Sequence, residues 1–399
     1  MTAKDQGRTL GERLDAATRH LPAPLAVVDL DALEANASDL VRRAGGVPVR
    51  VASKSVRVRA VLEKVLSRPG FHGVMAYSVR EASWLVAHGV DDVLVGYPSV
   101  DVAALQELAA DPRAAQAVTV MVDDVAHVDL VARAAAEAGR SLHVCVDVDA
   151  SLRPGIGPFR AHLGTRRSPV HTPADAAALA RVVATRAGVE LRGLMFYEAQ
   201  VAGLPDTSPA VRLVKRASVA DLARRRTAVL RAVEDAVGHE VPLVNSGGSG
   251  SIEVSARDRA VTEVTAGSGL FVPTLFDHYR SFTPRPAAFF GLDVVRRPAP
   301  GFATVHGGGY VASGPATRSR LPRPVAPDGL RLTSREGAGE VQTPLQGPGA
   351  RGLEIGDRVW FRHAKAGEVM ERFDAVHLVR GDMVVTTVPT YRGEQRAFG

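Results

Sequence analysis

The chain has 399 residues, 46% of them hydrophobic and 23% charged, with a formal net charge of +6, which is typical of a globular protein with one large and one smaller domain. Its basic residues are dispersed and only 5% of its residues are aromatic, so no basic segment interleaved with aromatics indicates a nucleic-acid partner. No apolar run approaches the roughly 18 residues that cross a bilayer, and no signal-peptide core opens the chain, so we expect no membrane partner and a cytoplasmic location.

The first 48 residues form a polar, partly helical segment followed by a strand and a helix. Residues 1–23 are polar and end at a turn from Pro22 to Pro24. Residues 25–30 are apolar and predict a strand. Asp31 follows this strand directly and is placed to cap the helix that comes next.

From residue 49 onward, short β-branched runs alternate with alanine-rich amphipathic stretches. The single cysteine, Cys145, lies in one of these apolar runs, and we expect it in the core. The predicted strands span residues 49–53, 73–77, 92–96, 118–122, 143–148, 191–197, 242–245 and 263–266, and the predicted helices span residues 56–67, 79–88, 102–110, 125–138, 174–187 and 212–237.

Strands that alternate with helices indicate parallel pairing through crossover connections. Eight such strands within about 220 residues predict an α/β fold of the (β/α)8 TIM-barrel type. A doubly wound open sheet is the alternative. We favour the barrel because no GxGxxG motif opens the first strand–helix unit.

After residue 284 the chain changes character, with frequent proline and short apolar runs separated by glycine. This pattern predicts a smaller, mostly antiparallel β domain. The strand at residues 25–30 has no place among the eight barrel strands and is assigned to this domain. We therefore predict a barrel over residues 32–284 and a discontinuous β domain over residues 1–31 and 285–399. Its later strands are predicted at residues 289–295, 302–305, 310–312, 358–362, 375–379 and 383–388, and residues 314–351 are predicted as loop.

Lys54 is the most informative residue at a predicted strand end. Only five of the 49 basic residues are lysine, and this one follows the first barrel strand. An ammonium can lose its proton and condense with a carbonyl group, whereas a guanidinium cannot. The alternative is a solvated lysine at a strand end.

Small residues follow the seventh and eighth predicted strands, where many barrels bind phosphate. Their backbone N–H groups and hydroxyls suit a phosphate, although flexible turns are the alternative. A lysine amine together with a phosphate site suggests pyridoxal phosphate. Arg153 and Tyr197 are candidates to contact the phenolic oxygen and the ring, or else an exposed loop arginine and a core tyrosine. The candidate phosphate residues are Ser246, Gly247, Gly248, Ser249, Gly250, Gly267, Ser268 and Gly269.

The segment at residues 27–36, followed by residues 51–55, resembles the opening of the alanine racemase-like, fold-type III pyridoxal phosphate enzymes. The closest resemblance is to their D-threonine aldolase and D-serine dehydratase branch. Other segments match that branch in order and spacing, so the resemblance covers most of the chain from about residue 24. These segments are Asp147-x-Asp149, Arg153-x-Gly155, residues 193–197, residues 245–250, Glu263-x-x-Ala266-Gly267-Ser268, residues 356–359 and residues 380–382.

This resemblance implies a role for each candidate residue. Lys54 would bind the cofactor's aldehyde, Arg153 would contact its phenolic oxygen, and Tyr197 would lie beside its ring. Thr265 would face the pyridine nitrogen, and the two small-residue loops would hold the phosphate. The resemblance also implies a homodimer with a composite site, in which the second domain of one subunit closes the site of the other.

The sequence departs from that branch at its metal-binding His-x-Cys or His-x-Asp motif, which here reads His363-Ala364-Lys365. An ammonium is not a metal ligand, so the divalent metal is left open, with His363 as the only candidate ligand in the motif. Alternatively, the charge of Lys365 takes the place of the metal and polarises a substrate hydroxyl or carboxylate. His363 is then a candidate general base, or a structural histidine. Other carboxylates within reach in the sequence are Glu368, Glu371 and Asp374.

The sequence thus predicts a pyridoxal phosphate-dependent lyase that acts on a small D-amino acid, one with a β-hydroxyl. The substrate amine would displace Lys54, and the enzyme would then cleave Cα–Cβ or eliminate the hydroxyl. One alternative is a racemase, which needs a second base such as Tyr310 or Tyr391. Another alternative is a non-catalytic pyridoxal phosphate carrier.

Overall fold

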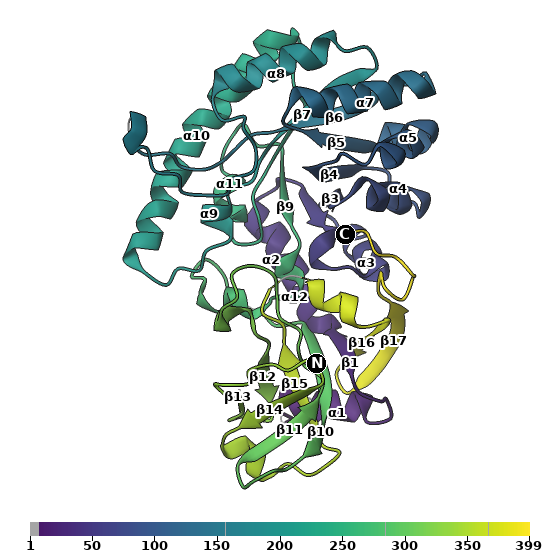
Figure 1. Cartoon of the computed structure of the whole chain (residues 1–399), viewed down its shortest axis with the longest axis vertical. Helices are drawn as coiled ribbons and strands as arrows, with labels where there is room; N and C mark the ends of the chain where they lie inside the picture. Colours follow the sequence, from purple (N-terminus) through teal and green to yellow (C-terminus); the bar gives the residue numbers. More distant parts are fainter. Residues whose placement is uncertain (1–7, 156, 284, 366) are drawn as a thin grey trace.

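The structure is a computed structural model that describes residues 8–155, 157–283, 285–365 and 367–399. Figure 1 shows a barrel surrounded by helices in the upper part of the molecule and a second sheet in the lower part. Eight parallel strands close the barrel in chain order, which confirms the predicted TIM barrel and excludes the open sheet. They are β2 (Val49–Ala52), β3 (Phe71–Ala76), β4 (Val93–Pro98), β5 (Val118–Val122), β6 (Leu142–Asp147), β7 (Val189–Phe196), β8 (Leu243–Ser246) and β9 (Glu263–Ala266).

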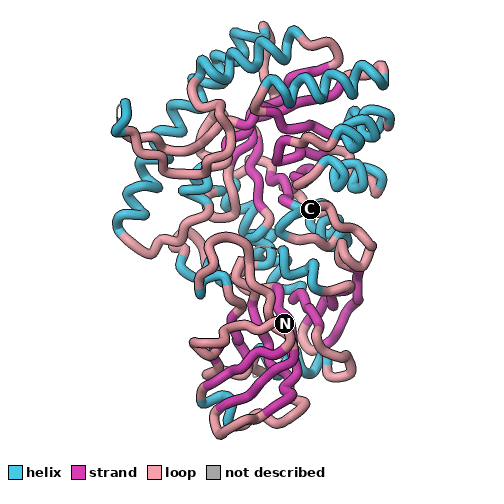
Figure 2. The backbone as a smooth tube through the Cα atoms, viewed as in Figure 1, coloured by secondary structure: helices cyan, strands magenta, loops and turns pink. Residues whose placement is uncertain are grey.

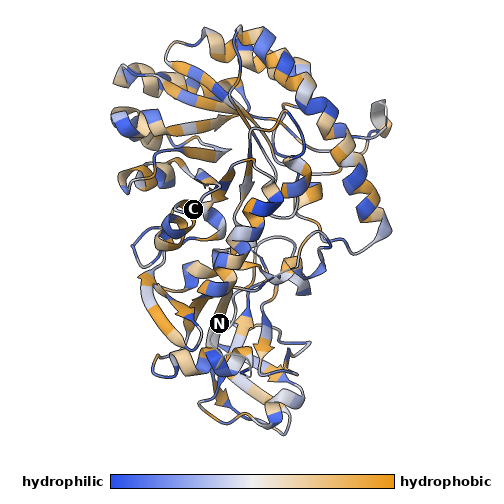
Figure 3. Cartoon of the chain, turned by 180° about the vertical axis from the view of Figure 1, so that it is seen from behind, coloured by the Kyte–Doolittle hydropathy of each residue, from blue (hydrophilic) through white to orange (hydrophobic). Residues whose placement is uncertain are grey.

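Helices lie outside the barrel strands, as the backbone drawing in Figure 2 makes clear. The longer ones are α2 (Leu30–Ala44), α3 (Arg59–Leu66), α4 (Val79–Ala87), α5 (Val102–Ala110), α6 (Pro112–Ala117), α7 (Val125–Ala138), α8 (Pro173–Thr185) and α10 (Pro209–Val237). In Figure 3 apolar residues concentrate on the strands and on the helix faces turned toward them. No helix among the described residues is long and apolar enough to span a membrane.

Three predicted helix starts are wrong, and one of them is that of α10, which begins at Pro209 and not at residue 212. Asp29, not Asp31, caps α2, because its side chain accepts a hydrogen bond from the Ala32 N–H at 3.1 Å. Asp31 lies in the first turn and forms an ion pair with Arg380 at 3.2 Å. The helix expected from residue 56 begins at Arg59, because Arg57 adopts a φ of 53°, which no α-helix accommodates.

The barrel interior is filled by one apolar layer and closed by a buried ion cluster. The guanidinium of Arg50 bonds Glu263 at 2.6 Å and Asp92 at 3.1 Å, near the amino ends of the strands. Burial of each large apolar side chain contributes roughly 1.5–3 kcal/mol. Cys145 belongs to this core, as predicted. The layer consists of Met75, Leu94, Met121, Cys145, Met195 and Leu243.

The second sheet includes the strand near the amino terminus. Strand β1 (Leu25–Asp29) pairs antiparallel with β10 (Ala288–Arg296) and parallel with β16 (Ala375–Arg380). A separate, mostly antiparallel sheet containing β1 is therefore present. The exact domain limits stay predictions, and the limit at residue 284 lies outside the described residues. The other strands of the sheet are β11 (Phe302–His306), β12 (Arg323–Ala326), β13 (Arg331–Leu332), β14 (Gln342–Gln346), β15 (Arg358–Arg362) and β17 (Met383–Pro389).

Two expectations for this sheet are wrong. Residues 310–312 do not form a strand, because the preceding glycines turn the chain and the Tyr310 N–H donates to the Gly308 carbonyl at 2.7 Å. The segment 314–351, expected as loop, contains β12, β13 and β14. The buried, alternating Thr343 and Leu345 of β14 are hidden in the sequence by neighbouring proline and glycine.

Candidate active site

The carboxyl ends of the barrel strands surround a cavity of about 340 Å³. Its lining combines residues of the barrel with residues of the second domain. Its described lining contains four cationic side chains and no carboxylate, so it suits an anionic ligand. The four cations are Lys54, Arg167, Arg320 and Lys365; other predicted site residues in the lining are Tyr197, Gly247, Gly248, Ser249, Thr265, Gly267 and Ser268.

Lys54 lies in a short 3-10 turn, Ser53–Ser55, directly after β2. Its Nζ donates a short hydrogen bond to the hydroxyl of Tyr97. Tyr97 lies at the carboxyl end of β4. The Nζ atom lies 5.0 Å from the centroid of the Tyr97 ring. The structure therefore adds Tyr97, which the sequence analysis missed, as the phenol in contact with the lysine.

The two small-residue loops are joined to each other by the side chain of Ser249. Its Oγ accepts hydrogen bonds from the N–H groups of Gly267 at 3.2 Å and Gly269 at 2.8 Å. Within the described part of the chain, the backbone N–H groups of Ser249 and Ser268 donate to no protein group, and both residues line the cavity. Two free N–H donors beside hydroxyls fit a phosphate.

The glycines of these loops have no room for a side chain. A Cβ at Gly248 would lie 2.9 Å from the Ala202 Cβ, and a Cβ at Gly267 would lie 2.5 Å from the Ala52 carbonyl oxygen. These close approaches explain the glycines better than a flexible turn does. Of the predicted phosphate residues, three do not line the cavity: Ser246, Gly250 and Gly269.

Thr265 presents a neutral hydroxyl to the cavity, and hydrogen bonds to neighbouring barrel residues hold its side chain. Its Oγ1 lies 2.7 Å from Nδ2 of Asn245, and the same amide group donates to Glu263 at 2.6 Å. Glu263 in turn bonds Arg50 of the buried ion cluster. This chain of contacts holds the Thr265 side chain in one place at the floor of the cavity.

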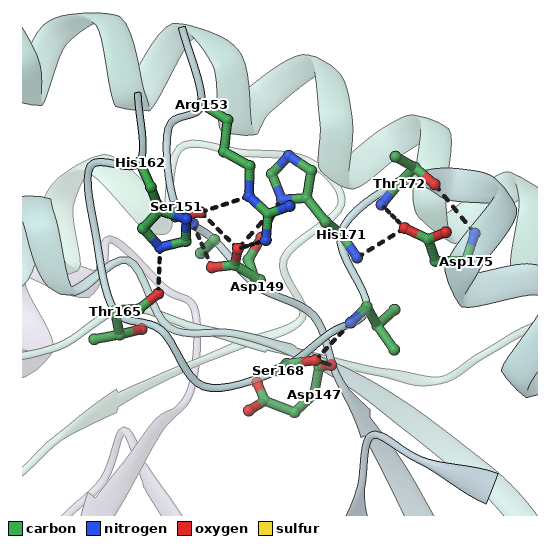
Figure 4. Close-up of polar contacts among 12 residues, drawn as sticks. Asp147, Asp149, Ser151, Arg153, His162, Thr165, Ser168, His171, Thr172 and Asp175 are labelled. Carbon is green, nitrogen blue, oxygen red and sulfur yellow. Dashed lines mark hydrogen bonds and ion pairs between the residues drawn. The ribbon is translucent and has the colours of Figure 1, made fainter. Parts of the chain in front are cut away.

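Arg153 is not among the arginines that line the cavity, which are Arg167 and Arg320. Arg153 pairs with Asp149 at 2.5 Å, as Figure 4 shows. The Cζ atom of Arg167 lies 5.7 Å from the Tyr197 ring centroid and 6.0 Å from that of Tyr97. This geometry does not match the expectation that Arg153 contacts the cofactor. Arg167 comes from an irregular loop, where no periodic pattern marks it.

The structure separates the two candidates of the His363-Ala364-Lys365 segment. The His363 side chain is buried, does not line the cavity, and lies edge-on to Phe271 with ring centroids 6.5 Å apart. Burial and the neighbouring Arg362 lower its pKa to about 3. His363 is therefore neutral and lies outside the cavity lining, whereas Lys365 is part of it. The structure does not place His363 in the cavity lining, and the general-base and metal-ligand roles considered for it stay predictions.

The donor set does not fit a metal ion. Among the described residues, no three His, Cys, Asp or Glu side chains are grouped as metal ligands would be. The carboxylates considered as substitutes are engaged elsewhere. Glu368 accepts from the Ser313 N–H, Glu371 pairs with Arg57 at 3.0 Å, and Asp374 pairs with Arg392 at 2.9 Å.

A second chamber of about 440 Å³ shares Tyr97, Arg167 and Tyr197 with the cavity and is also lined by Asp147. In Figure 4 the Asp147 carboxylate lies apart from the hydrogen-bonded cluster around Asp149. Burial and the nearby Asp123 raise the pKa of Asp147 to about 7. The folded protein therefore holds a proton on Asp147 at pH values where the unfolded chain has lost it.

This raised pKa predicts how Asp147→Asn changes the pH dependence of stability. In the wild-type protein, the cost of burying the charged carboxylate is absent at pH 3, grows above the ordinary pKa of 3.8 and is complete above pH about 7. The amide does not titrate. We expect the variant to gain about 1–2 kcal/mol relative to wild type between pH 5 and pH 8, after allowing for water in the chamber.

Urea unfolding of both proteins at pH 5 and pH 8 measures this difference. Asp258→Asn is not a suitable control, because Asp258 pairs with Arg226. Asp129→Asn is suitable, because the ion pair of Asp129 on α7 with Arg186 is exposed, where such pairs contribute little to stability, whereas the pair of Asp258 is buried. A stability difference between Asp147→Asn and wild type that is equal at the two pH values would contradict the assignment.

A barrel with a lysine at the end of its first strand, together with a second sheet that contributes to the cavity, is the arrangement to compare with known families. The family described as "Alanine racemase, N-terminal domain" matches residues 28–274. The chain belongs to this family.

Two individual relatives with known names are similar to this chain over part of its length. The chain is 26% identical over 263 residues to a 3-hydroxy-D-aspartate aldolase of Paracoccus denitrificans (strain Pd 1222), covering 63% of this chain and 61% of the relative. It is 28% identical over 251 residues to a D-threonine aldolase of Arthrobacter sp, covering 62% and 61%. The alignments thus span about 61% of the length of these relatives.

A solved structure extends the likeness over nearly the whole fold. The structure of D-threonine aldolase from Filomicrobium marinum matches with a TM-score of 0.78 at 23% identity, covering 94% of this chain and 96% of that one. This match includes the second domain. It confirms the predicted architecture of a barrel with a separate β domain.

Proposed function

We propose that this protein is a pyridoxal phosphate-dependent lyase acting on a small D-amino acid with a β-hydroxyl. The observation that carries the proposal is the cavity itself, whose lining brings together the Lys54 amine and the joined loops of Ser249 and Ser268. The names of the two curated relatives, both aldolases of D-amino acids, support the reaction class.

The cofactor, when bound, would supply the electron sink that stabilises negative charge at the substrate Cα. The protein's own residues would then bind and move protons. Lys54 would hold the aldehyde carbon of the cofactor and give way to the substrate amine, and the Tyr97 hydroxyl would orient the lysine by accepting its hydrogen bond. The N–H groups of Ser249 and Ser268 would hold the phosphate.

Lys365 would act at the substrate β-oxygen. Burial lowers its pKa, and the charges of Arg320 and Lys54 lower it further. An ammonium that loses its proton more readily than usual transfers that proton more easily near neutral pH. Arg167 and Arg320 would neutralise the substrate carboxylate. In this account Lys365 does the work that the relatives' branch is expected to assign to a metal.

A panel assay tests the proposal. We expect the purified protein to show a visible absorption band of bound cofactor and to convert D-threonine or D-serine, with or without prior treatment by a chelator. D-alanine, which lacks the β-hydroxyl, should give neither aldehyde nor 2-oxo acid. Bound cofactor without turnover of any member of the panel would instead indicate the carrier alternative.

No observation favours the racemase alternative. Tyr391 is fully buried and donates to Glu81 at 2.8 Å, and Tyr310 packs against Phe290 and Phe373. Neither tyrosine lines the cavity of its own chain. The homodimer with a composite site and the cytoplasmic location remain predictions.

A further inference from the structure

Glu198 follows β7 and lies beneath the loop at residues 246–251. Its side chain is buried, and the residue is only 2% exposed. Oε1 accepts hydrogen bonds from the hydroxyls of Ser251, at 2.9 Å, and Ser255. Oε2 accepts from the Gly247 N–H at 3.2 Å and lies 2.9 Å from the Ser246 Oγ. One carboxylate therefore gathers four groups of a single stretch of chain.

The negative charge of Glu198 is balanced by Arg226 of α10. Its Nη2 lies 3.4 Å from Glu198 Oε2 and donates to the Ser246 Oγ at 2.6 Å, while Nη1 pairs with Asp258 at 3.0 Å. A buried carboxylate is tolerated only when such partners satisfy it. Neither Glu198 nor Arg226 lines the cavity, so their effect on a ligand must pass through the loop.

The contacts of Glu198 decide which loop groups are used internally and which stay free. The Gly247 N–H and the Ser251 hydroxyl are bound on the Glu198 side. On the cavity side, the Ser249 N–H has no partner among the residues that the structure describes, and the Ser249 Oγ joins Gly267 and Gly269. Without the carboxylate, the Gly247 N–H and three hydroxyls would seek other acceptors, and the loop would lose this arrangement.

We propose that Glu198 is a positioning residue for the phosphate of the cofactor, holding the loop so that the Ser249 N–H stays available. This inference rests on the proposed function, because it takes the cofactor to be pyridoxal phosphate. It makes a specific prediction: loss of Glu198 weakens binding of the phosphate and leaves the contacts of the ring and aldehyde largely intact.

Comparing pyridoxal phosphate with pyridoxal isolates the phosphate contribution. The full-length protein, freed of cofactor, is titrated with each compound and followed by absorbance. We expect Glu198→Ala to weaken pyridoxal phosphate binding about tenfold to a hundredfold and pyridoxal binding less than about threefold. The ratio of the affinity for pyridoxal phosphate to the affinity for pyridoxal should also fall in Glu198→Gln. This fall should be smaller than in Glu198→Ala, because serine hydroxyls can turn and accept hydrogen bonds from the amide.

Asp92→Ala is the matched control. Asp92 is also a buried carboxylate paired with an arginine, Arg50, but it lies at the amino ends of the barrel strands. We expect its loss to lower the thermal midpoint and leave the affinity ratio unchanged. If Glu198→Ala does not fold, Ser255→Ala removes one contact to Glu198 outside the loop and should lower the ratio more mildly.

Equal weakening of both compounds by Glu198→Ala, or the same change of ratio in Asp92→Ala, would overturn this inference and leave the proposed function standing. Equal affinity of the unaltered protein for the two compounds would overturn the proposed cofactor, and the inference with it.

Discussion

Lys54→Ala should abolish turnover, with activity falling by about 10³-fold or more, and should end covalent retention of pyridoxal phosphate. Lys54 is the lysine next to Tyr97 in the cavity, and Arg167, Arg320 and Lys365 are the other cations there. A guanidinium cannot replace its chemistry. Treatment with borohydride followed by mass spectrometry of the intact protein measures how much cofactor is fixed to the chain.

Lys64→Ala is the control for this substitution. Lys64 lies on α3, pairs with Glu34 at 3.0 Å on the outside of the barrel, and has a 39% exposed side chain. We expect this variant to keep both the covalent label and the activity. Covalent cofactor on Lys54→Ala at the wild-type level would show that another amine, and not Lys54, binds the aldehyde.

Lys365→Met should lower kcat by about 10²–10³-fold while the cofactor stays bound, because proton transfer by a positioned side chain contributes about this much. A methionine side chain is similar in length to that of lysine and carries no charge. Burial and the neighbouring cations lower the pKa of Lys365, so we also expect the wild-type activity to depend on a group that titrates below the ordinary pKa of lysine. The pH profiles of kcat for wild type and variant measure both effects.

Chelation is the second part of this test. Because the position of a metal ligand is occupied by Lys365 and His363 does not line the cavity, we expect wild-type activity to survive exhaustive treatment with a chelator. Lys64→Met serves as the control for the substitution. Full activity in Lys365→Met, or loss of wild-type activity on chelation with recovery on adding a divalent metal, would contradict the role given to Lys365.

The barrel was predictable because its strands are short, β-branched and buried on both faces. Parallel strands of this kind stand out from the alanine-rich helices between them. The segment 314–351 was not predictable by the same means, since Pro344 and the glycines around β14 mask a strand that its pairing with β11 and β13 defines. The cap of α2 was missed by two residues because β1 ends directly in the helix.

The candidate site was predictable at the strand ends and not beyond them. Lys54 and the two small-residue loops stand out by residue type. Tyr97 and Glu198 also follow strands, but an isolated tyrosine or glutamate gives no signal until its partners are known. Arg167 lies in a loop, and the direction of the His363 side chain depends on how the two domains meet, which no sequence pattern records.

The bond that the enzyme breaks can be observed directly by following a β-hydroxy D-amino acid with the protein in D₂O by proton NMR. The account predicts loss of the intact carbon skeleton, as glycine plus an aldehyde or as a 2-oxo acid, with the D-enantiomer and not the L-enantiomer. Exchange of deuterium at Cα with the skeleton intact and both enantiomers formed would identify a racemase and contradict the account.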